Sequence, residues 1–416
     1  MTIWTIIGGE PLPLSGWNGR IMRNGIISSM LAERGHDVTW FTSDFSHQQK
    51  KRMRPAQCSE FPQERLEICM LHADTLYEKH IGFARLKYLK QLGTAFAKEA
   101  RKREKPDIIF CALPSIDFAY EAVKYGLENN VPVIIDVRDL WPDIFWQVFP
   151  RAMQPIIKLL TAGMRHHVCF IMKHATVITT VAKVGLKWAK SYGRELKAQD
   201  QVLYLAYQDE TISAEEMKAA NEFWDAQDIK KGMNNICFFG NIGTTIDIAP
   251  VVQAITLLKG EQYKLIFCGD GDKKAEYQKD TSNFCEVVYP GYITRPQIAA
   301  LMERSIAGLL PYNKVTFKDM MPNKPIEYMA GGIAVISSLQ GELKGILDEH
   351  MAGCTYNDGV ELADIIRRLI HDQEEVKMLG QNAKELFKKE FSTDMVYTEF
   401  CDFIEKYDAK SEEVEI

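Results

Sequence analysis

The chain has 416 residues, 46% hydrophobic and 25% charged, which is typical of a folded protein with packed cores, and this length favours two domains. No apolar run reaches the roughly 20 residues of a membrane-spanning helix, and we expect no export signal at the N-terminus. The net charge of −6, without a visible binding module, argues against nucleic acid as a partner.

The charge is unevenly distributed along the chain. Residues 1–200 contain 28 lysines and arginines against 20 acids, a balance of +8, whereas the remainder contains 22 against 36, a balance of −14. Such halves are expected to form different domains with different partners. A basic half suits an anionic surface or a phosphate-bearing ligand, and ordinary solvated lysines are the alternative interpretation.

The nine cysteines are scattered and include no C-x-x-C pair. Their irregular spacing favours reduced thiols in a cytoplasmic protein over disulfides or a zinc site.

In the first half of the chain, apolar runs typical of strands alternate with helical patterns. Uninterrupted Val, Ile and Leu runs of this kind predict parallel strands that are buried on both faces. The predicted strands are 3–8, 35–43, 106–113, 131–139 and 175–181, and the predicted helices are 20–34, 83–104 and 117–129.

The same alternation restarts after an acidic segment at 208–227, which we interpret as a surface helix or a linker. The fold class predicted is α/β, with a doubly wound parallel sheet present twice and a break near residue 205. The predicted strands are 235–240, 263–271, 284–293, 306–312 and 333–338, and the predicted helices are 247–260, 295–305, 325–331 and 394–407.

Ligands of such sheets bind beyond the carboxyl ends of the strands, so the strand-to-helix loops are the candidate sites. The first loop, 8–20, carries Gly8, Gly9, Gly16 and Gly19 ahead of Arg20 and Arg23. It lacks the G-x-G-x-x-G dinucleotide pattern, and it is interpreted as a phosphate- or sugar-contacting loop, with a surface turn as the alternative.

The segment DVRDLWPD ends a predicted strand with Asp136, Arg138, Asp139 and Asp143, which we expect to pack together. Charged groups at a buried strand end are costly unless they are paired or functional, and an internal Arg–Asp pair is the alternative to a site. Trp141 offers a flat face for stacking on a sugar or packing a lid.

Two glycine-rich turns follow strands in the second half. Gly240, Asn241 and Gly243 precede a helix whose cap is predicted at Thr245 or Asp247, and amides there could cradle an anion. The turn at 268–277 contains Asp270 and Asp272, for which turn chemistry is favoured over a metal.

The stretch MPNKPIEYMAGGIAVISS, 321–338, joins a loop to a helix and a strand. Pro325 and Glu327 are predicted in the first helical turn, where the helix dipole favours a carboxylate. Glu327 could accept hydrogen bonds from two hydroxyls of a ribose, and Lys324, predicted just before the helix, is placed to meet a diphosphate. A plain helix-start charge is the alternative for Glu327.

This stretch resembles the donor-site signature of family 4 retaining glycosyltransferases, which have the GT-B fold. The matching residues are Pro322, Lys324, Glu327, Tyr328, Ala330, Gly332, Val335 and Ile336, and further matching pieces lie at 240–243, 269–271, 290–295 and 309–312. In the first half, the glycine loop, residues 34–43 and DVRDLWPD resemble the branch that builds bacterial capsule, O-antigen and exopolysaccharide.

The resemblance implies two Rossmann-like domains facing across a cleft. Residues 1–205 would bind the acceptor and residues 206–390 the donor. Residues 391–416 would form a C-terminal helix that packs back on the first domain, followed by an acidic tail.

The resemblance also assigns roles to residues. Glu327 would hold the ribose, Asp319 would replace a glutamate that touches the donor sugar, and Lys324 with Arg295 would supply charge, since 240–258 has no Lys or Arg. Arg138 or Asp139 stands where many relatives have a catalytic histidine, and 203–210 departs from the family's interdomain motif. The other donor-site candidates are Asn323, Gly240, Asn241, Gly243, Thr244, Gly269, Gly291 and Tyr292, and Gly16, Gly19 and Arg20 would form an acceptor or phosphate loop.

The implied reaction transfers a sugar, with retention, from a nucleotide diphosphate sugar, expected to be a UDP-sugar, without a metal or other cofactor. The departing diphosphate would take the acceptor's proton, and Asp139 would orient the acceptor. Related enzymes use a glycan or a polyprenyl-diphosphate-linked acceptor at the inner face of the plasma membrane.

A membrane contact of the basic first domain is therefore expected for this cytoplasmic protein. Residues 153–172 are interpreted as one interfacial amphipathic helix with a plain surface helix as the alternative, and the helix at 83–104 would add to the same surface. The basic residues involved are Lys158, Arg165, His166, His167, Lys173, Lys50, Lys51, Arg52 and Arg54.

Two other functions remain open from the sequence. A UDP-sugar 2-epimerase shares the two-domain fold but would need carboxylates and a histidine around the sugar. A non-catalytic subunit that binds a nucleotide sugar and supports an active partner is the second alternative.

Overall fold

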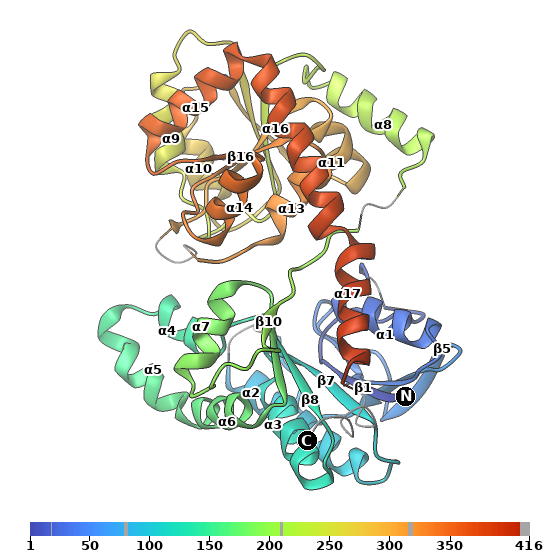
Figure 1. Ribbon diagram of the computed structural model, residues 1–416. Coiled ribbons are helices and arrows are strands. Elements are labelled where there is room, and N and C mark those ends of the chain that lie inside the picture. Colours follow the sequence, from blue (N-terminus) through green and yellow to red (C-terminus); the bar gives the residue numbers. More distant parts are fainter. Residues whose placement is uncertain (18, 79–81, 209–210, 315–318, 408–416) are drawn as a thin grey trace. The chain divides into compact units, whose positions relative to one another are not determined.

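Figure 1 shows the computed structural model, which describes the chain except residues 18, 79–81, 209–210, 315–318 and 408–416. The chain forms two compact units, one of Met1–Leu205 with the segment from Val396 onward, and one of Ala206–Met395. The domain break predicted near residue 205 falls at this division. The predicted acidic tail, 408–416, lies outside the described residues.

The first unit is built on a sheet of eight described strands in the order β10-β9-β8-β7-β1-β2-β6-β5. All neighbouring pairs are parallel except β5 with β6. Every residue of β7 and β8 is buried, as their uninterrupted apolar runs predict. The strands are β1 Thr2–Ile6, β2 Asp37–Ser43, β5 Cys58–Gln63, β6 Leu66–Leu71, β7 Ile108–Leu113, β8 Val133–Val137, β9 Val177–Thr180 and β10 Gln201–Val202, and the short pair β3 Phe45–Ser46 and β4 Lys51–Arg52 lies outside the sheet.

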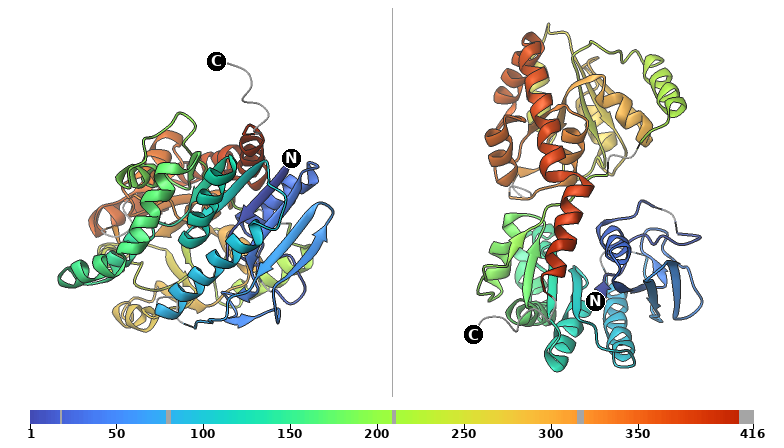
Figure 2. Two further views of the ribbon diagram at one scale, coloured as in Figure 1. Left: turned by 90° about the horizontal axis from the view of Figure 1, so that it is seen from below. Right: turned by 45° about the vertical axis from the view of Figure 1, so that its right-hand side comes forward.

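Helices cover both faces of this sheet (Figures 1 and 2). α2, α3 and α6 pack side by side on one face, and α1 lies on the other face with α17, the last helix of the chain. The helices are α1 Arg23–Glu33, α2 Phe83–Ala100, α3 Ile116–Asn129, α4 Asp143–Val148, α5 Gln154–Leu160, α6 Ala162–His174, α7 Lys183–Ser191 and α17 Thr393–Glu405, with a 3₁₀ turn at Arg151–Met153.

Several elements of this unit were not predicted, and one predicted helix was wrong in detail. The antiparallel strand β5 was missed because its alternating polar residues carry no buried apolar run. The predicted helix 153–172 is two helices, α5 and α6, that meet at Thr161. The buried hydroxyl of Thr161 accepts a hydrogen bond from the Trp146 indole at 3.2 Å and donates one to the Ile157 carbonyl at 2.8 Å, which holds the bend.

The second unit contains a parallel sheet of six described strands in the order β13-β12-β11-β14-β15-β16. Numbered along this unit, the order is 3-2-1-4-5-6, which is the Rossmann order. The strands are β11 Asn235–Phe239, β12 Lys264–Cys268, β13 Val287–Gly291, β14 Ser305–Leu310, β15 Ala334–Ser337 and β16 Gly353–Thr355.

α9 and α15 pack together on one face of this sheet, and α13 packs with α16 on the other (Figure 1). The acidic segment predicted as a surface helix or linker forms α8, which buries Trp224 and bonds its indole to the Gln297 carbonyl at 2.8 Å. The helices are α8 Ala214–Asp225, α9 Ala249–Leu257, α10 Lys274–Asp280, α11 Arg295–Met302, α13 Asn323–Ala330, α14 Glu342–His350, α15 Gly359–His371 and α16 Gln373–Leu386, with a π-helical turn at Phe387–Phe391. The predicted α/β fold with two Rossmann-like domains is confirmed.

Candidate functional site

The strand order of the second unit places its candidate site at β11 and β14. These strands are neighbours, although two strand-helix units separate them in the chain, so the connections leave in opposite directions at this point. Ligands of open α/β sheets bind outside the carboxyl ends of the strands at such a switch point. The segments that follow β11 and β14 contain Gly240–Thr244 and Asp319–Glu327, so topology brings together the two stretches that the sequence singled out.

The glycine loop after β11 is locked onto the turn after β12. The amide of Gly240 donates to the Cys268 carbonyl at 2.9 Å, and that of Ile242 donates to the Asp270 carbonyl at 2.8 Å. A Cβ on Gly271 would lie 2.6 Å from the Asn241 side-chain oxygen, so the two turns approach too closely for larger residues. The described residues provide no such partner for the amides of Asn241, Gly243 and Thr244, which are the donors left to meet an anion.

The predicted helix cap in this loop needs a correction. α9 begins at Ala249, and its N-cap residue is Ile248 rather than Thr245 or Asp247. The Asp247 carboxylate still accepts the Ala249 amide at 3.1 Å. The helix starts late because Ile246 first pairs with Tyr312, which ties this loop to the end of β14.

The side chain of Lys324 reaches from α13 across this glycine loop. A Cβ on Gly240, whose φ is +142°, would lie 2.7 Å from the Lys324 Nζ, and that Nζ is 5.7 Å from the centre of the Phe238 ring. Burial lowers the pKa of Lys324, and Glu327 partly offsets that effect. Gly240 is therefore the position that leaves room for an ammonium group beside the free amides of the loop.

The start of α13 differs from the sequence prediction. The helix begins at Asn323 after the extended Pro322, so Lys324 is its second residue and Glu327 lies in its second turn. The argument that the helix dipole favours Glu327 was wrong. Lys324 and Glu327 instead share one helix face because they are three residues apart.

Glu327 also acts on Tyr312, which follows β14. The pKa of Tyr312 is raised to about 12, mainly by burial and further by the Glu327 charge. One half-buried carboxylate thus lies close to both an ammonium group and a phenol. This arrangement offers hydrogen-bond acceptors and a cation to a polar ligand at the same sheet edge.

Tyr328 fixes the position of α13. Its buried hydroxyl donates to the carbonyls of Cys237 in β11 and Leu309 in β14, at 3.3 and 3.2 Å. Its ring covers Gly308, where any Cβ would overlap the ring. The residue that follows Glu327 therefore anchors the helix to the two strands of the switch point.

Other predicted donor-site residues lie in more open positions. Asp319 and Asn323 are exposed, and Tyr292 is 84% exposed. The Gly291 carbonyl accepts the Gly269 amide at 2.7 Å, which leaves Tyr292 at the edge of the loop after β13.

Arg295 contacts a different part of the unit. Its guanidinium donates to the Gln208 carbonyl at 2.8 Å and lines a hollow of about 290 Å³ with Tyr207 and Lys384. No contact with Lys324 is found among the described residues. The predicted role of Arg295 in holding a phosphate gains no support from this placement.

The described residues contain no group of three His, Cys, Asp or Glu side chains suited to a metal. Asp270 is exposed, lies 3.7 Å from the Lys274 ammonium and accepts the Gly271 amide at 2.9 Å. The bond to the Gly271 amide is the turn chemistry that the sequence favoured, here seen for Asp270.

In the first unit, β1 and β7 form the corresponding switch point. The loop after β1 includes Gly16 and Gly19, with φ of +85° and +128°, and a Cβ on Gly19 would lie 2.8 Å from the Gln48 side-chain oxygen. Gly19 and Arg20 are both exposed. Asn18 of this loop lies outside the described residues.

Beneath that loop lies a buried ion-pair network. Arg23 contacts Asp136 at 3.2 Å, Arg138 donates to Asp136 at 2.7 Å, and Arg138 also pairs with Glu10. Burial lowers the pKa of Arg138, but Glu10 and Asp136 outweigh it and raise the pKa overall. Arg138 thus forms the internal Arg–Asp pair that was the alternative to a catalytic role.

The acids of DVRDLWPD do not all pack together as predicted. Asp143 starts α4 and accepts hydrogen bonds from the Trp188 indole at 3.2 Å and from the Tyr192 hydroxyl, which ties α4 to α7. Asp139 stays near Arg138, and burial raises its pKa while Arg138 and Arg85 lower it. Trp141 lies under Arg85, with 4.6 Å from the guanidinium carbon to the ring centre.

The basic cluster at residues 50–54 is mostly engaged within the unit. Arg52 pairs with Asp44 at 2.5 Å, and Arg54 pairs with Glu60 at 2.5 Å. These pairs argue against the predicted membrane-facing role of this cluster. Lys50 instead lies over the Tyr77 ring, a position near Arg85 that sequence reasoning missed because 35 residues separate the two cations.

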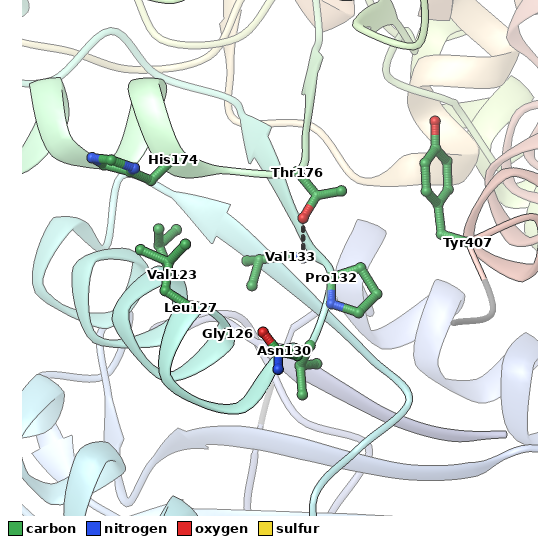
Figure 3. Close-up of a pocket in the computed structure, with 10 residues that line it drawn as sticks. Val123, Gly126, Leu127, Asn130, Pro132, Val133, His174, Thr176 and Tyr407 are labelled. Atoms are coloured by element: carbon green, nitrogen blue, oxygen red, sulfur yellow. Dashed lines mark hydrogen bonds between the residues drawn. The ribbon is translucent and has the colours of Figure 1, made fainter. Parts of the chain in front are cut away.

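A further hollow of about 290 Å³ lies at the amino ends of β8 and β9 (Figure 3). The Thr176 hydroxyl accepts the Val133 amide there at 2.9 Å, and Val123, Leu127 and Pro132 supply an apolar lining. It is at the opposite edge of the sheet from the loops described above, so the switch-point rule does not select it.

The second unit carries the decisive sequence match. Residues 220–386 match the family glycosyl transferases group 1. The match spans the sheet, the glycine loop and α13. The prediction that the chain is a glycosyltransferase enzyme is confirmed by this domain, and no curated protein sequence gives a significant match to the chain.

Solved structures similar to the chain share its fold over nearly full length. Sucrose-phosphate synthase from Thermosynechococcus elongatus is 15% identical, with a TM-score of 0.72 and coverage of 99% of this chain and 100% of that one. Anabaena HepE, solved with UDP, is 12% identical, with a TM-score of 0.65 and coverage of 98% and 100%. WaaG, a glycosyltransferase involved in lipopolysaccharide biosynthesis, is 11% identical, with a TM-score of 0.57 and coverage of 97% and 99%. At these identities the likeness supports the GT-B fold.

Proposed function

We propose that this protein is a retaining family 4 glycosyltransferase that transfers a sugar from a UDP-sugar to a glycan or polyprenyl-linked acceptor in bacterial surface polysaccharide biosynthesis. The observation that carries the proposal is the pairing of Lys324 and Glu327 on α13 beside the loop at Gly240. HepE structures with UDP and with UDP-glucose support the choice of nucleotide.

In the proposed reaction, the second unit holds the nucleotide. Glu327 accepts hydrogen bonds from the ribose hydroxyls, and Lys324 with the amides of Asn241, Gly243 and Thr244 faces the diphosphate. These are preorganised groups at the place where negative charge develops as the sugar leaves. Asp319 would contact the donor sugar and Tyr292 would lie beside the base.

The bond changes need no metal or enzymic base. The bond between the anomeric carbon and the diphosphate oxygen breaks, and the acceptor oxygen bonds to that carbon on the same face. The acceptor's proton passes to the leaving diphosphate oxygen. Lys324 offsets the charge that accumulates on the diphosphate before this transfer.

The first experiment is a thermal-shift screen of the full chain with UDP, GDP, ADP and CMP, each with and without EDTA. We expect a shift with UDP that survives EDTA and is lost in Glu327→Ala, while Glu349→Gln, an exposed acid of α14, serves as the matched control. No shift with any nucleotide would overturn the catalytic proposal and favour the non-catalytic subunit. A shift that EDTA removes would overturn the metal-free mechanism.

Measurements of kcat then test the proposed phosphate role of Lys324. Lys324→Ala should cost about 2–4 kcal/mol of transition-state stabilisation, as the loss of an oxyanion donor does, which is a fall of roughly 30- to 1,000-fold in kcat. The exposed Lys259→Ala is the control for loss of a positive charge. A fall of less than threefold in the Lys324 variant would refute its phosphate role.

A membrane contact is proposed at α5. Met153 beside this helix is 43% exposed, and Ile156, Leu159 and Leu160 are 58%, 77% and 63% exposed. Lys158 and Arg165 lie 4.8 Å from the Trp146 ring beneath, so cations flank this apolar face. Apolar residues with a basic rim match an anionic lipid surface. Among the described residues, none of the helices has both the length and the apolar character to span a bilayer.

Vesicle sedimentation tests this contact at the inner face of the plasma membrane. Binding to phosphatidylglycerol-containing vesicles should fall in Leu159→Ser/Leu160→Ser and, in a salt-dependent way, in Lys158→Gln/Arg165→Gln. The control is Leu257→Ser, the same substitution at a leucine of the second unit that is 46% exposed. It should leave vesicle binding unchanged. Unchanged binding in both α5 variants would overturn the assignment, as would self-association of the chain through α5 without lipid binding.

A further inference from the structure

Three connections near the carboxyl ends of the first sheet meet around Tyr77 and Arg85. His47 and Lys50 come from the segment between β3 and β4, Tyr77 follows β6, and Arg85 belongs to the first turn of α2. Trp141 follows β8 and lies under Arg85. These positions are separated by more than 90 residues in the chain, so only the fold brings them together.

Two cations share the ring of Tyr77. The Lys50 Nζ is 5.0 Å from the ring centre, and the Arg85 guanidinium carbon is 5.8 Å from it. His47 lies within 2.5 Å of the Tyr77 hydroxyl and 3.4 Å of the Lys50 Nζ, measured from its Nδ1. The pKa of Lys50 is lowered by burial and by the charge of Arg85. Two like charges over one ring repel each other, and a bound anion relieves that repulsion.

Several acidic residues of this unit form ion pairs with other arginines. Asp44 pairs with Arg52, and Glu10 and Asp136 pair with Arg138. Asp139 is close enough to Arg85 for its negative charge to raise the pKa of that guanidinium. Its side chain makes no hydrogen bond within the described part of the chain, so it can accept one from a ligand hydroxyl.

Unsatisfied buried atoms lie in the ion-pair network of Arg138, the residue that precedes Asp139. The Nη2 of Arg138 is buried without a hydrogen-bond partner among the described residues, although the other nitrogens of that guanidinium are engaged. The side chain of Asn24 is fully buried and both of its polar atoms are also unpaired there. Buried polar groups normally have partners, so these atoms point to ligand or water atoms at this switch point.

We infer that the first unit binds its acceptor through a phosphate or diphosphate group held between Lys50 and Arg85, while Asp139 accepts a hydrogen bond from a sugar hydroxyl of the same molecule. This inference rests on the proposed glycosyl transfer and names the chemical class of its acceptor, a phosphorylated sugar. The buried rings of Tyr77 and Trp141, 7% and 8% exposed, support the two cations from below. A soluble sugar phosphate and a lipid-linked sugar diphosphate both offer this chemistry.

The binding test uses inorganic pyrophosphate and the full chain carrying Lys324→Ala, which removes the cation of the nucleotide site. Calorimetry should detect pyrophosphate binding that weakens at least tenfold in Lys50→Gln and in Arg85→Gln. Arg85→Lys, which keeps the charge, should retain most of it, and the exposed pair Lys87→Gln/Lys90→Gln on α2 is the control. Equal binding in all these proteins, or none in the parent, would overturn the inference.

The kinetic test separates this inference from the proposed function. With Lys324 intact, Lys50→Gln and Arg85→Gln should raise the KM for a phosphorylated acceptor at least tenfold while the UDP-induced thermal shift stays unchanged. Comparison of a hexose 6-phosphate with a short-chain polyprenyl diphosphate sugar identifies the source of the phosphate. A neutral sugar used equally well by the parent and the variants would overturn the inference and leave the transferase proposal standing.

Discussion

At the scale of single residues, the proposed donor site depends on one position without a side chain. Gly240 lies beneath the aliphatic part of Lys324, and its φ of +142° is one that other residues rarely adopt. Because the nearest atoms belong to the flexible end of Lys324, a methyl group here would move the ammonium rather than break the fold. Lys324 and Gly240 therefore act as one unit although 84 positions separate them.

Gly240→Ala should consequently reduce activity more than stability. We expect kcat to fall about as far as in Lys324→Ala, while the free energy of unfolding falls by about 1–3 kcal/mol from backbone strain. Gly232→Ala is the matched control, since Gly232 has a φ of +82° and open space around it. Steady-state kinetics and urea denaturation check the pair. Equal activity losses in both variants would show that strain, not displacement of Lys324, is responsible.

The lowered pKa of Lys324 predicts proton uptake when a nucleotide binds. Free protein loses the Lys324 proton at a pH below the ordinary lysine value of 10.5, and an adjacent diphosphate should raise that pKa again. Between the lowered pKa of the free protein and the raised pKa of the complex, the complex would thus hold more protons than the free protein. Calorimetry in two buffers of different ionisation enthalpy measures this uptake, which should vanish in Lys324→Met.

The same pKa sets the sign of its effect on stability. Between the folded and unfolded pKa values of Lys324, the unfolded chain binds more protons, so this residue makes the protein more stable as pH rises through that window. The free energy of unfolding of the parent is compared with that of Lys324→Met across this pH window. A parent that became less stable than the variant as pH rises would contradict the lowered pKa.

At the scale of elements, the position of α13 is set by contacts of its buried side with the sheet. Tyr328 bonds to both strands of the switch point, and Gly308 of β14 leaves space for its ring. The helix face that carries Lys324 and Glu327 is thereby held at the carboxyl ends of β11 and β14. Positions that never touch a ligand still decide where the site residues lie.

Gly308→Ala should therefore weaken both the fold and the nucleotide site. A rigid ring fills the space that the new methyl group needs, and overpacking of this kind costs about 1–3 kcal/mol. Gly345→Ala in α14, where a Cβ meets open space, should instead be neutral or stabilising. Unfolding curves and UDP titrations measure both effects. Unchanged UDP affinity in a destabilised Gly308→Ala variant would mean that α13 tolerates the shift.

At the scale of the whole molecule, the end of the chain completes the first unit. α17 buries Phe400 against Phe110, with ring centres 5.1 Å apart, and Arg23 lies 4.5 Å above the same ring. Asp402 and Glu405 form ion pairs with Arg34 at the partly exposed rim. Apolar burial is expected to dominate, since exposed ion pairs contribute little.

Phe400→Ala should destabilise the first unit by about 3–5 kcal/mol, as large-to-small changes in a core do. Asp402→Asn should cost less than about 1 kcal/mol. The second unit should keep its own transition, so hydrogen exchange resolved by segment is the suitable measurement. Equal losses in the two variants would show that the ion pairs hold α17.

The sequence by itself determines the α/β class and singles out the residues of the proposed donor site. Uninterrupted apolar runs such as IIFCAL favour strands buried on both faces, and the spacing of Lys324 and Glu327 within one short helix is local information. Helix boundaries were less accurate, because the extended Pro322 and the pairing of Ile246 with Tyr312 depend on neighbouring segments.

Only the tertiary structure decides which distant residues meet. Strand order places Gly240 under Lys324, sets Lys50 and Arg85 on one tyrosine ring, and turns Arg138 into a structural ion pair with Glu10 and Asp136. A charged residue at a strand end has the same local sequence whether it is paired or open to a ligand. The difference lies in the partners that other strands supply, and no periodicity along the chain encodes those contacts.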